Sequence, residues 1–427
     1  MIILTIISIL LFNINCLTAG QWVTVDSNYA NIYRAIDCID SNTCLTIANY
    51  SGWGAFVRKT IDGGNIWSVL YDNSKESMGL KLNDLACPND SLYLVACNNG
   101  KILRSVNGGK SWDTIKLKTD ANLVRLFMMT DNFGCVLGNP NKCDFYVTQN
   151  KGQTWDNIRL DDSLKFYYAA DVFITKDTIF NFLLNSQEGK YFLSYDYKSD
   201  RLKILECPKG ISRLFFLDSD TGWGVGSYFS GSTVFSCIYK TTDRGSSWQT
   251  QIEKPGFHIS DIKFFDDFSG IAVGHNQTVI RTTDGGGNWL SDSTYPPYAN
   301  PLFFLKVSIP SRTRQYLIAH QGVVKRYDLT TSINNENQND SEKPVIFPNP
   351  INRDLMMFKL ILNTEFYVAD YSLFDILGVN VTDYIKTFKK QYENIIEFEL
   401  SNSTPDGIYY FILKSGKRNY TNKIIIY

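Results

Sequence analysis

The sequence predicts an all-β protein: a seven-bladed β-propeller followed by a smaller β domain. A short phrase, Ser/Thr-x-Asp/Asn-x-Gly-x-x-Trp, recurs five times at an even interval, and each interval holds four strand-like runs between turns. Repeats of this length are typical of propellers and solenoids, and four strands per repeat make a propeller blade. The polar segment 332–343 (SINNENQNDSEK) predicts a linker between the two domains.

The five copies of the phrase are recognised by their acid or amide and their tryptophan. They are Asp62 with Trp67, Asn107 with Trp112, Asn150 with Trp155, Asp243 with Trp248, and Asp284 with Trp289. Two incomplete copies fill the remaining places, since Asp196 follows a serine at the right spacing and Asp328 stands alone. With them the acid or amide recurs every 41 to 47 residues, which gives seven repeats.

A structural role for the phrase follows from its residue types. An Asp or Asn side chain accepts hydrogen bonds from backbone N–H groups two residues further on, which tightens a turn. Glycine adopts the positive φ that such a turn requires. Tryptophan offers a large apolar face that packs between neighbouring blades. We therefore interpret the regularly spaced acids as turn-forming residues, in preference to catalytic ones.

The strands within a repeat follow one order. A first apolar strand (259–265) leads through a polar turn to a second that ends in glycine (270–274), and a third (278–281) runs into the phrase. The tryptophan opens the fourth strand, which the seventh repeat lacks. Residues 20–25, with Trp22 and no preceding phrase, have the character of that missing strand. We predict that they complete the seventh blade and close the ring, which removes an exposed sheet edge.

The first residues of the chain are predicted to be a signal peptide, 1–19. The apolar run 2–12 is too short to span a bilayer, and small residues follow it, although a basic start is missing. Cys16 permits a lipoprotein as the alternative, but Asn13 to Asn15 lack the small residues expected before a lipidated cysteine. No later segment is apolar enough to predict a transmembrane helix.

Eight of the nine cysteines lie outside this leader, an even number that suits an oxidising compartment. Cys38 and Cys44 bracket the first turn of one blade, and Cys87 and Cys97 bracket the same turn in the next, which predicts two hairpin disulfides. Elimination leaves Cys135–Cys143 and Cys207–Cys237, with buried free thiols as the alternative. Because Cys-x-x-Cys is absent and only three histidines occur, the sequence predicts no metal site and no cofactor.

One set of charged residues is predicted to face the propeller axis. Aligning the first strands of blades 2 to 6 places alternating charges at one position: Asp84, Arg125, Asp171, Arg213 and Asp261. Blades 1 and 7 offer Ala35 and Phe303 there. This channel ring is open to two interpretations. Its members either form ion pairs that fix the order of the blades, or they line a polar channel that holds a ligand, a water molecule or an ion.

Four ordered motifs distinguish the last domain, 344–427. They are Pro348, Asn349 and Pro350 after Phe347; Asp375 and Gly378 within LFDILG; Gly407 and Tyr409 within GIYYF; and Lys423 within KIII. In this order they resemble the type A sorting domain of the type IX secretion system. The resemblance implies a small Ig-like β-sandwich that the outer-membrane export machinery recognises. It further implies a protein that reaches the outer cell surface or the medium by way of the periplasm.

The repeats of residues 20–331 resemble the BNR/Asp-box superfamily, with spacing close to that of the photosystem II assembly factors. The five phrases and the strand Gly-Trp-x-Val-Gly at 222–226 carry the resemblance. It implies a seven-bladed, non-enzymatic scaffold that binds other macromolecules. For an exported chain, this predicts a module that binds an unidentified extracellular protein or glycan.

A surface glycoside hydrolase acting at the axial mouth is the alternative, because sialidases and some β-glucan-cleaving hydrolases are also Asp-box propellers. Sialidases need an arginine cluster and usually open with Arg-Ile-Pro, which is absent. Other glycosidases need two carboxyl groups about 5 to 9.5 Å apart, and the sequence identifies no such pair. With 42 basic and 43 acidic residues and no basic run, a nucleic-acid partner is not indicated.

Overall fold

The computed structural model divides into two compact units, of which Trp22–Asp328 is one and the residues from Leu329 onward belong to the other. The residues that it describes are 21–28, 31–50, 54–74, 79–139, 145–158, 166–186, 190–292, 302–311, 314–328, 345–347, 351, 356–361, 370–375, 380–392, 395–415 and 418–426. The predicted signal peptide and linker lie outside these ranges.

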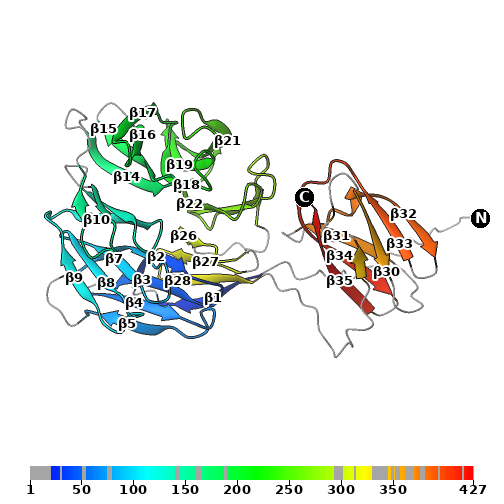
Figure 1. Cartoon of the computed structure of the whole chain (residues 1–427), viewed down its shortest axis with the longest axis horizontal. Coiled ribbons are helices and arrows are strands. Elements are labelled where there is room, and N and C mark those ends of the chain that lie inside the picture. Colours follow the sequence, from blue (N-terminus) through cyan, green and yellow to red (C-terminus); the bar gives the residue numbers. More distant parts are fainter. Residues whose placement is uncertain are drawn as a thin grey trace, which may run out of the picture. The chain divides into compact units, whose positions relative to one another are not determined.

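In the described residues of the first unit there are seven four-stranded sheets (Figure 1). Consecutive antiparallel hairpins form six of them, and in the seventh the N-terminal strand pairs with the last strand of the propeller. The first strands are β2 (Asn31–Cys38), β6 (Leu82–Ala86), β10 (Asn122–Met128), β14 (Phe166–Ile174), β18 (Ile211–Phe216), β22 (Ile259–Phe264) and β26 (Phe304–Ser308). The second strands are β3 (Cys44–Tyr50), β7 (Tyr93–Cys97), β11 (Gly134–Asn139), β15 (Ile179–Ser186), β19 (Gly222–Ser230), β23 (Gly270–Gly274) and β27 (Arg314–Ala319).

The outer half of each blade is also regular. The third strands are β4 (Ala55–Thr60), β8 (Lys101–Ser105), β12 (Phe145–Thr148), β16 (Lys190–Asp196), β20 (Thr233–Thr241), β24 (Val279–Thr282) and β28 (Val323–Asp328). The fourth strands are β5 (Ser68–Asp72), β9 (Asp113–Lys116), β13 (Asp156–Asn157), β17 (Arg201–Glu206), β21 (Gln249–Pro255), β25 (Leu290–Ser291) and, for the seventh blade, β1 (Gln21–Ser27).

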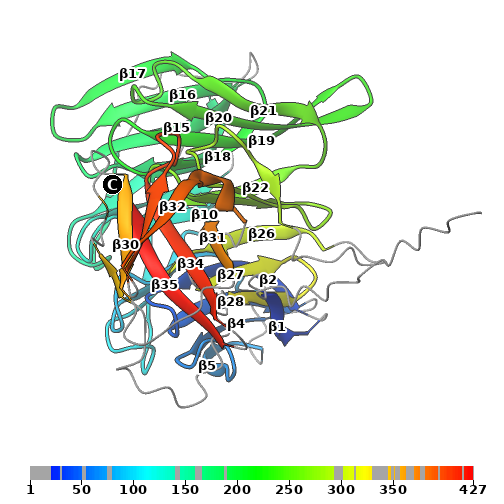
Figure 2. The same ribbon diagram turned by 90° about the vertical axis from the view of Figure 1, so that its right-hand side faces the viewer.

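The seven blades form a closed ring. Each first strand lies against the first strand of the next blade, and β26 of the last blade lies against β2 of the first. The sheet order β1-β28-β27-β26 shows that the N-terminal strand completes the seventh blade. Figures 1 and 2 both place β27 and β28, in yellow, beside β1 and β2, in blue. The Trp22 ring packs on Tyr327 of β28, and its Nε1 donates to Asp292 of the sixth blade at 3.0 Å.

The apolar core lies between neighbouring blades. Every residue of the second strands β7 and β23 is buried, because a blade covers each face of these strands. The fourth strand β9 is largely exposed, since it forms the outer edge of its blade. A seam between the first two blades, for example, joins Leu45 and Ile47 to Leu82 and Tyr93. Burial of these aliphatic and aromatic surfaces on both sides of each sheet is the main stabilisation of the ring.

One of the predicted disulfides forms and the other does not. Cys38 and Cys44 face each other in the β2–β3 pairing and are bonded. Cys87 and Cys97 are buried free thiols, so their predicted bond is wrong. The reason is the register of β6 and β7, in which Cys97 lies opposite Leu82 while Cys87 follows the other end of β6. The remaining described thiols, Cys135, Cys207 and Cys237, are also free, and Cys16 and Cys143 fall outside the described residues.

The second unit is a two-sheet sandwich, as the fold prediction expects. One sheet has the order β29 (Val345–Phe347), β30 (Met357–Ile361), β33 (Ile395–Leu400), β32 (Ile385–Tyr392). The other has the order β31 (Asp370–Asp375), β34 (Gly407–Ser415), β35 (Arg418–Ile426), and a 3-10 turn, η2 (Thr382–Tyr384), precedes β32. Phe358 and Phe398 of the first sheet pack on Phe411 of the second, with ring centroids 5.3 and 4.8 Å away.

Several residues of the predicted sorting motif occupy defined places in this sandwich. Asp375 ends β31 opposite Tyr409, whose buried hydroxyl donates to Pro405 O at 2.7 Å. Gly407 opens β34, and Lys423 lies in β35. Pro348, Asn349, Pro350 and Gly378 fall outside the described residues. The described part of the chain contains no helix that is long and apolar enough to cross a membrane.

Candidate functional site

The five phrases form one repeated turn. In the first, Thr60 Oγ1 donates to Asp62 Oδ1 at 2.8 Å and accepts from the Gly64 N–H at 2.8 Å. Asp62 Oδ1 also accepts from the Ile66 N–H at 2.9 Å. The same three bonds recur in Ser105, Asn107 and Gly109; Thr148, Asn150 and Gly152; Thr241, Asp243 and Gly245; and Thr282, Asp284 and Gly286.

Two details differ from the expected turn. The acid or amide side chain accepts from the N–H four residues on, not two, because the intervening Gly N–H is taken by the Ser or Thr hydroxyl. The glycine has a second role besides its positive φ. A Cβ on Gly245 would lie 2.3 Å from the Phe192 ring of the previous blade, so the turn packs directly on its neighbour. The tryptophans add to this contact, since Trp248 also packs edge-on against Phe192.

Because the aspartates of these turns have lowered pKa values, we expect the stability of the folded propeller to fall at acidic pH. Hydrogen bonds from Ser247 hold the pKa of Asp243 below its ordinary value, and the pKa values of Asp62 and Asp284 are lowered as well. A carboxyl whose pKa is depressed by folding adds stability above its unfolded pKa of about 3.9, and loses it as the pH falls through the folded value. Changing all three to Asn should therefore reduce the loss of stability between neutral and strongly acidic pH.

Urea unfolding midpoints at neutral and acidic pH provide the measurement. Asn107→Asp in the second blade is the matched control, because its turn has the same hydrogen bonds and the change should increase acid sensitivity. Equal pH dependence of the wild type and the triple variant would contradict a role for these carboxylates in acid unfolding.

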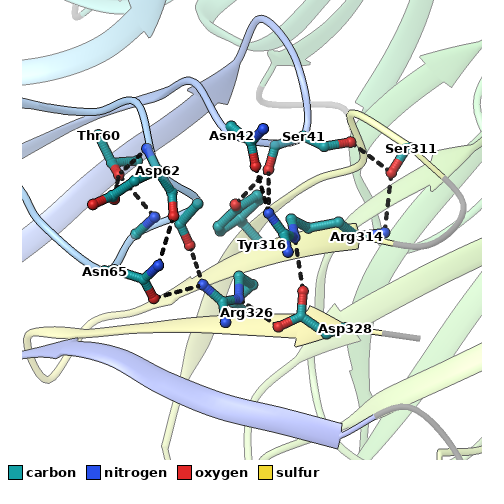
Figure 3. Close-up of polar contacts among 12 residues, drawn as sticks. Ser41, Asn42, Thr60, Asp62, Asn65, Ser311, Arg314, Tyr316, Arg326 and Asp328 are labelled. Carbon is teal, nitrogen blue, oxygen red and sulfur yellow. Dashed lines mark hydrogen bonds and ion pairs between the residues drawn. The ribbon is translucent and has the colours of Figure 1, made fainter. Parts of the chain in front are cut away.

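The incomplete phrase of the seventh blade makes a different contact. Asp328 Oδ1 accepts from Arg314 Nε at 2.7 Å, and its Oδ2 accepts from Arg326 Nε at 2.6 Å (Figure 3). Arg326 stands where other phrases have the hydroxyl. Its Nη1 donates to the carbonyl of Gly63 at 2.5 Å, in the turn of the first blade. Arg314 Nη1 reaches Asn42 Oδ1 at 2.6 Å. We name Arg314, Arg326 and Asp328 the closure clamp, because they bind the last blade to the first.

The channel ring is the candidate functional site. Arg125 forms the ion pairs between blades that the first interpretation of the ring predicts. Arg125 contacts two ring carboxylates, Asp84 through Nη1 at 3.1 Å and Asp171 through Nε at 2.5 Å. Ring carboxylates also accept backbone N–H groups from the next blade, since Leu126 N donates to Asp84 at 3.1 Å and Leu214 N donates to Asp171 at 2.7 Å. These three members therefore link blades 2 to 5.

The structure places Lys306, not Phe303, at the ring position of the seventh blade. Each first strand carries a bulge just before this position, and the bulge before Lys306 aligns it with Asp84. The sequence-based alignment slipped by three residues because the apolar run Phe303 to Leu305 imitates the strand that follows the ring position elsewhere. Lys306 Nζ forms an ion pair with Asp84 of the second blade. The small side chain at the intervening position, Ala35, leaves room for this contact.

Arg213 and Asp261 are less fully paired than the rest. Asp261 Oδ2 accepts from the Val307 N–H at 3.0 Å. Among the described residues, Arg213 Nη1 donates to two backbone carbonyls, those of Ala170 at 3.3 Å and Ser212 at 3.0 Å. The first interpretation, ion pairs between blades, thus holds around Arg125, and the interpretation as a channel that holds a ligand, a water molecule or an ion stays a prediction.

Titration of the axial acids bears on whether they could catalyse. Burial alone would raise the pKa of Asp84, but the charges of Lys306 and Arg125 outweigh burial and hold that pKa below its ordinary value. Such an acid stays ionised and is a poor proton donor at neutral pH. Burial raises the pKa of Asp37, whose Oδ2 accepts from the Cys87 N–H at 2.9 Å. In the part of the chain that is described, no group of three or more His, Cys, Asp or Glu side chains could hold a metal ion.

All three histidines of the sequence gather at one end of the first strands of the last blades. His258 precedes β22, and its ring lies 5.0 Å from that of His275, which in turn lies 4.9 Å from Phe303. Burial lowers the pKa of His275, and the positive charge of His320 lowers it further. Sequence reasoning missed this cluster, although its signal was available: the histidines all lie at strand ends of consecutive repeats.

Comparisons with known proteins agree with this architecture. Residues 14–328 match the model of the family described as photosynthesis system II assembly factor YCF48, and residues 345–427 match that of the secretion system C-terminal sorting domain. The chloroplastic photosystem II stability/assembly factor HCF136 of Arabidopsis thaliana is 18% identical over 293 residues, which cover 63% of this chain and 70% of HCF136.

Solved structures give the same result. The structure of YCF48 bound to D1 peptide superposes with a TM-score of 0.57 at 14% identity, covering 74% of this chain and 96% of YCF48. PorZ, an essential bacterial surface component of the type-IX secretion system of Porphyromonas gingivalis, superposes with a TM-score of 0.52 at 11% identity. That match covers 94% of this chain and 59% of PorZ. At these identities the likeness shows the fold alone.

Proposed function

Since this chain belongs to the family of photosynthesis system II assembly factor YCF48 and ends in a secretion system sorting domain, we propose that it is an exported, non-catalytic binding module. Its propeller binds a segment of an extracellular protein, and its last domain directs it through the type IX machinery to the cell surface or the medium. Passage through the periplasm and removal of residues 1–19 are parts of the same proposal.

The observation that carries the non-catalytic reading is the use of the ring carboxylates. Asp84 and Asp171 are both held by Arg125, and each also accepts a backbone N–H from the next blade. A glycosidase needs one carboxyl group that gives up a proton to the leaving oxygen and a second on the opposite side of the scissile bond. Carboxylates fixed as hydrogen-bond acceptors and ion-pair partners are suited to holding blades together.

We favour a protein partner over a glycan because structurally similar propellers bind a peptide or belong to a protein assembly. The YCF48 structure was solved with a bound D1 peptide, and PorZ is a surface component of the type IX system itself. Fold likeness alone is weak ground for function, so the partner class requires a direct test.

The test uses the purified full chain and two sets of candidate ligands. A displayed library of random peptides is panned on the immobilised protein, and a panel of host and plant glycans is incubated with it and analysed by mass spectrometry. Acid-unfolded protein is the control for non-specific retention. Enrichment of related peptides by the folded chain alone is the expected result.

Two outcomes would contradict the proposal. Shortened glycan products would favour the surface glycoside hydrolase and direct attention to the axial carboxylates, tested by Asp→Asn changes. Retention of intact glycans without peptide enrichment would replace a protein partner by a glycan.

A further inference from the structure

The fifth blade carries a hairpin that extends past the rest of its sheet. Strands β19 and β20 are each nine residues long, and they pair as far as Ser230 opposite Thr233. The first strand of the blade, β18, pairs with β19 only up to Gly226. Residues 227–236 therefore form a projection at the end of the blade where β18 begins.

The tip of this hairpin is apolar and uncharged. The segment 227–238 (SYFSGSTVFSCI) contains no acidic or basic residue, in a chain of which 20% is charged. Phe229 is 75% exposed, more than any other large apolar side chain of the described residues. Tyr228 stacks on Phe235 on the opposite face of the hairpin, with ring centroids 5.5 Å apart. An aromatic ring so placed gains hydrophobic free energy only when another surface covers it.

A chain of contacts joins this hairpin to the same end of the next two blades. Ser227 Oγ lies 2.7 Å from His258 Nδ1. The ring centroids of His258 and His275 lie 5.0 Å apart, and those of His275 and Phe303 lie 4.9 Å apart. The His320 N–H donates to the carbonyl of Phe303 at 2.9 Å. Blades 5, 6 and 7 therefore present one continuous surface at the end where their first strands begin.

Two further exposed aromatic rings lie on this surface. Phe257 directly precedes His258, and its carbonyl accepts from Ser236 Oγ of the hairpin. Phe303 directly precedes β26. We name Phe229, Phe257 and Phe303 the aromatic face. Large exposed apolar side chains that gather on one surface are typical of an interaction site.

The charge of this surface is one-sided. Its described segments contain no aspartate or glutamate; they are 207–213, 227–238, 254–260, 274–280, 302–306 and 319–323. The opposite end of blades 5 and 6, where the repeated phrases lie, carries Asp218, Asp220, Asp243, Asp266, Asp267 and Asp284. An anionic partner would therefore be attracted to the end with the aromatic face and repelled by the other end.

Exposed lysines border the aromatic face. Lys209 lies in the connection that leads into the fifth blade, and Lys254 lies near the end of β21. Lys254 pairs with Ser236, so its side chain is on the same side of the sheet as Phe229. The neighbouring Glu253 is on the other side, where its Oε1 accepts from the Tyr228 hydroxyl at 2.7 Å.

We propose that the aromatic face docks on an anionic phospholipid surface, with Phe229 in the headgroup layer and Lys209 and Lys254 against lipid phosphates. This contact goes beyond the proposed protein-binding function. Aromatic side chains beside basic groups are typical of segments that lie in a membrane interface. The hairpin tip enters this layer without taking a charge out of water, and the hydroxyls of Ser230 and Ser232 keep hydrogen-bonding partners at that depth.

Sedimentation with phospholipid vesicles tests the proposal on the purified full chain. One set of vesicles is phosphatidylcholine alone, and the other is phosphatidylcholine mixed with phosphatidylglycerol. The chain is expected to sediment with the mixed vesicles and several-fold less with the neutral ones. High salt should weaken binding to the mixed vesicles, because it screens the lysines from the phosphates.

Variants assign the binding to this face. Phe229→Ser should weaken it about tenfold, the value for burying part of one aromatic side chain. Lys254→Gln should weaken it about fivefold, the value for one cation near an anionic surface. The matched controls are Ile66→Ser, at a side chain 68% exposed in the first blade, and Lys110→Gln, exposed in the second. Both controls should bind as the wild type does, and equal urea midpoints verify that all four variants fold.

The depth of the hairpin tip is measured separately. Phe229→Trp adds an indole at the tip, and Ile66→Trp adds one at the control position, to the same eight native tryptophans. Lipids brominated on their acyl chains quench a nearby indole. Additional quenching is expected for Phe229→Trp and not for Ile66→Trp.

The proposal is overturned if the full chain binds neither kind of vesicle, which would leave a soluble protein as the occupant of the aromatic face. It is overturned as well if Phe229→Ser binds as tightly as the wild type, because the membrane contact then lies elsewhere. Neither result touches the proposed protein-binding function, which is tested with peptides in the absence of lipid.

Discussion

Asp84→Ala is expected to lower the free energy of unfolding by about 3 to 5 kcal/mol, the range for removing one member of a buried ion pair. The Asp84 side chain is 2% exposed and serves Arg125, Lys306 and the N–H groups of Leu85 and Leu126. Its removal leaves Lys306 without its ion-pair partner and Arg125 with Asp171 alone, and it removes the ion pairs that join blades 2, 3 and 7 at the axis.

Urea unfolding of the full chain, followed by tryptophan fluorescence, measures this loss. Asp113→Ala is the matched control. Asp113 forms an ion pair with Arg104 at 3.8 Å, but its side chain is 74% exposed. Exposed pairs of this kind contribute about 1 kcal/mol or less. If both variants unfold at the same urea concentration, the ring contributes no more to stability than a surface contact does.

Asp328→Ala, in the closure clamp, should cost about 2 kcal/mol, between the values for buried and exposed ion pairs. Its carboxylate holds Arg314 and Arg326, whose side chains are 28% and 14% exposed. Without it both guanidinium groups lose the orientation in which they contact Asn42 and the Gly63 carbonyl (Figure 3). The effect should therefore be greatest where the first and seventh blades meet.

Hydrogen exchange read by mass spectrometry is the suitable measurement, because it resolves blades. Faster exchange is expected in β28 and in the turn that contains Gly63, with little change in the fourth blade. Asp220→Ala is the control, since Asp220 accepts from Arg244 Nε at the same 2.6 Å but is 58% exposed. Uniform exchange across all seven blades would show that the clamp does not act locally.

The periodic part of the fold could be predicted because its signal repeats. Each of the five phrases predicts the same turn, and errors in one copy are corrected by the others. The pairing of β1 with the seventh blade followed from counting strands, since one blade lacked a fourth strand and one strand lacked a blade. The sandwich fold of the last domain rested on its ordered motifs, of which Tyr409 and Gly407 occupy defined positions in β34.

Features that depend on register or on side-chain reach could not be read in the same way. Lys306 was missed because the apolar run Phe303 to Leu305 resembles the residues that follow the ring position in other blades, and only the position of the bulge in the β26–β27 pairing identifies the equivalent residue. Cys87 and Cys97 lie at opposite ends of the β6–β7 pair, because Cys97 pairs with Leu82 at the far end of the hairpin, and the spacing of the two cysteines does not reveal this. The clamp arises where the repeat pattern fails at Arg326, so a search for matching copies passes over it. The contacts of Arg213 with the carbonyls of Ala170 and Ser212 depend on side-chain conformation, which a single sequence does not record.

The first strand of the propeller, β1, cannot pair until the last strand, β28, is available. Its partner β28 lies at the other end of the propeller sequence, so their pairing closes a loop that contains every other blade. Contacts between such distant segments form slowly, because the entropy of loop closure must be overcome before the contact stabilises anything. Blades 1 to 6 can each form from local hairpins as soon as their own strands exist. The ring itself becomes complete only when the last blade is available, so loss of β1 would leave β28 as an unpaired edge, and loss of β28 would leave β1 without its partner.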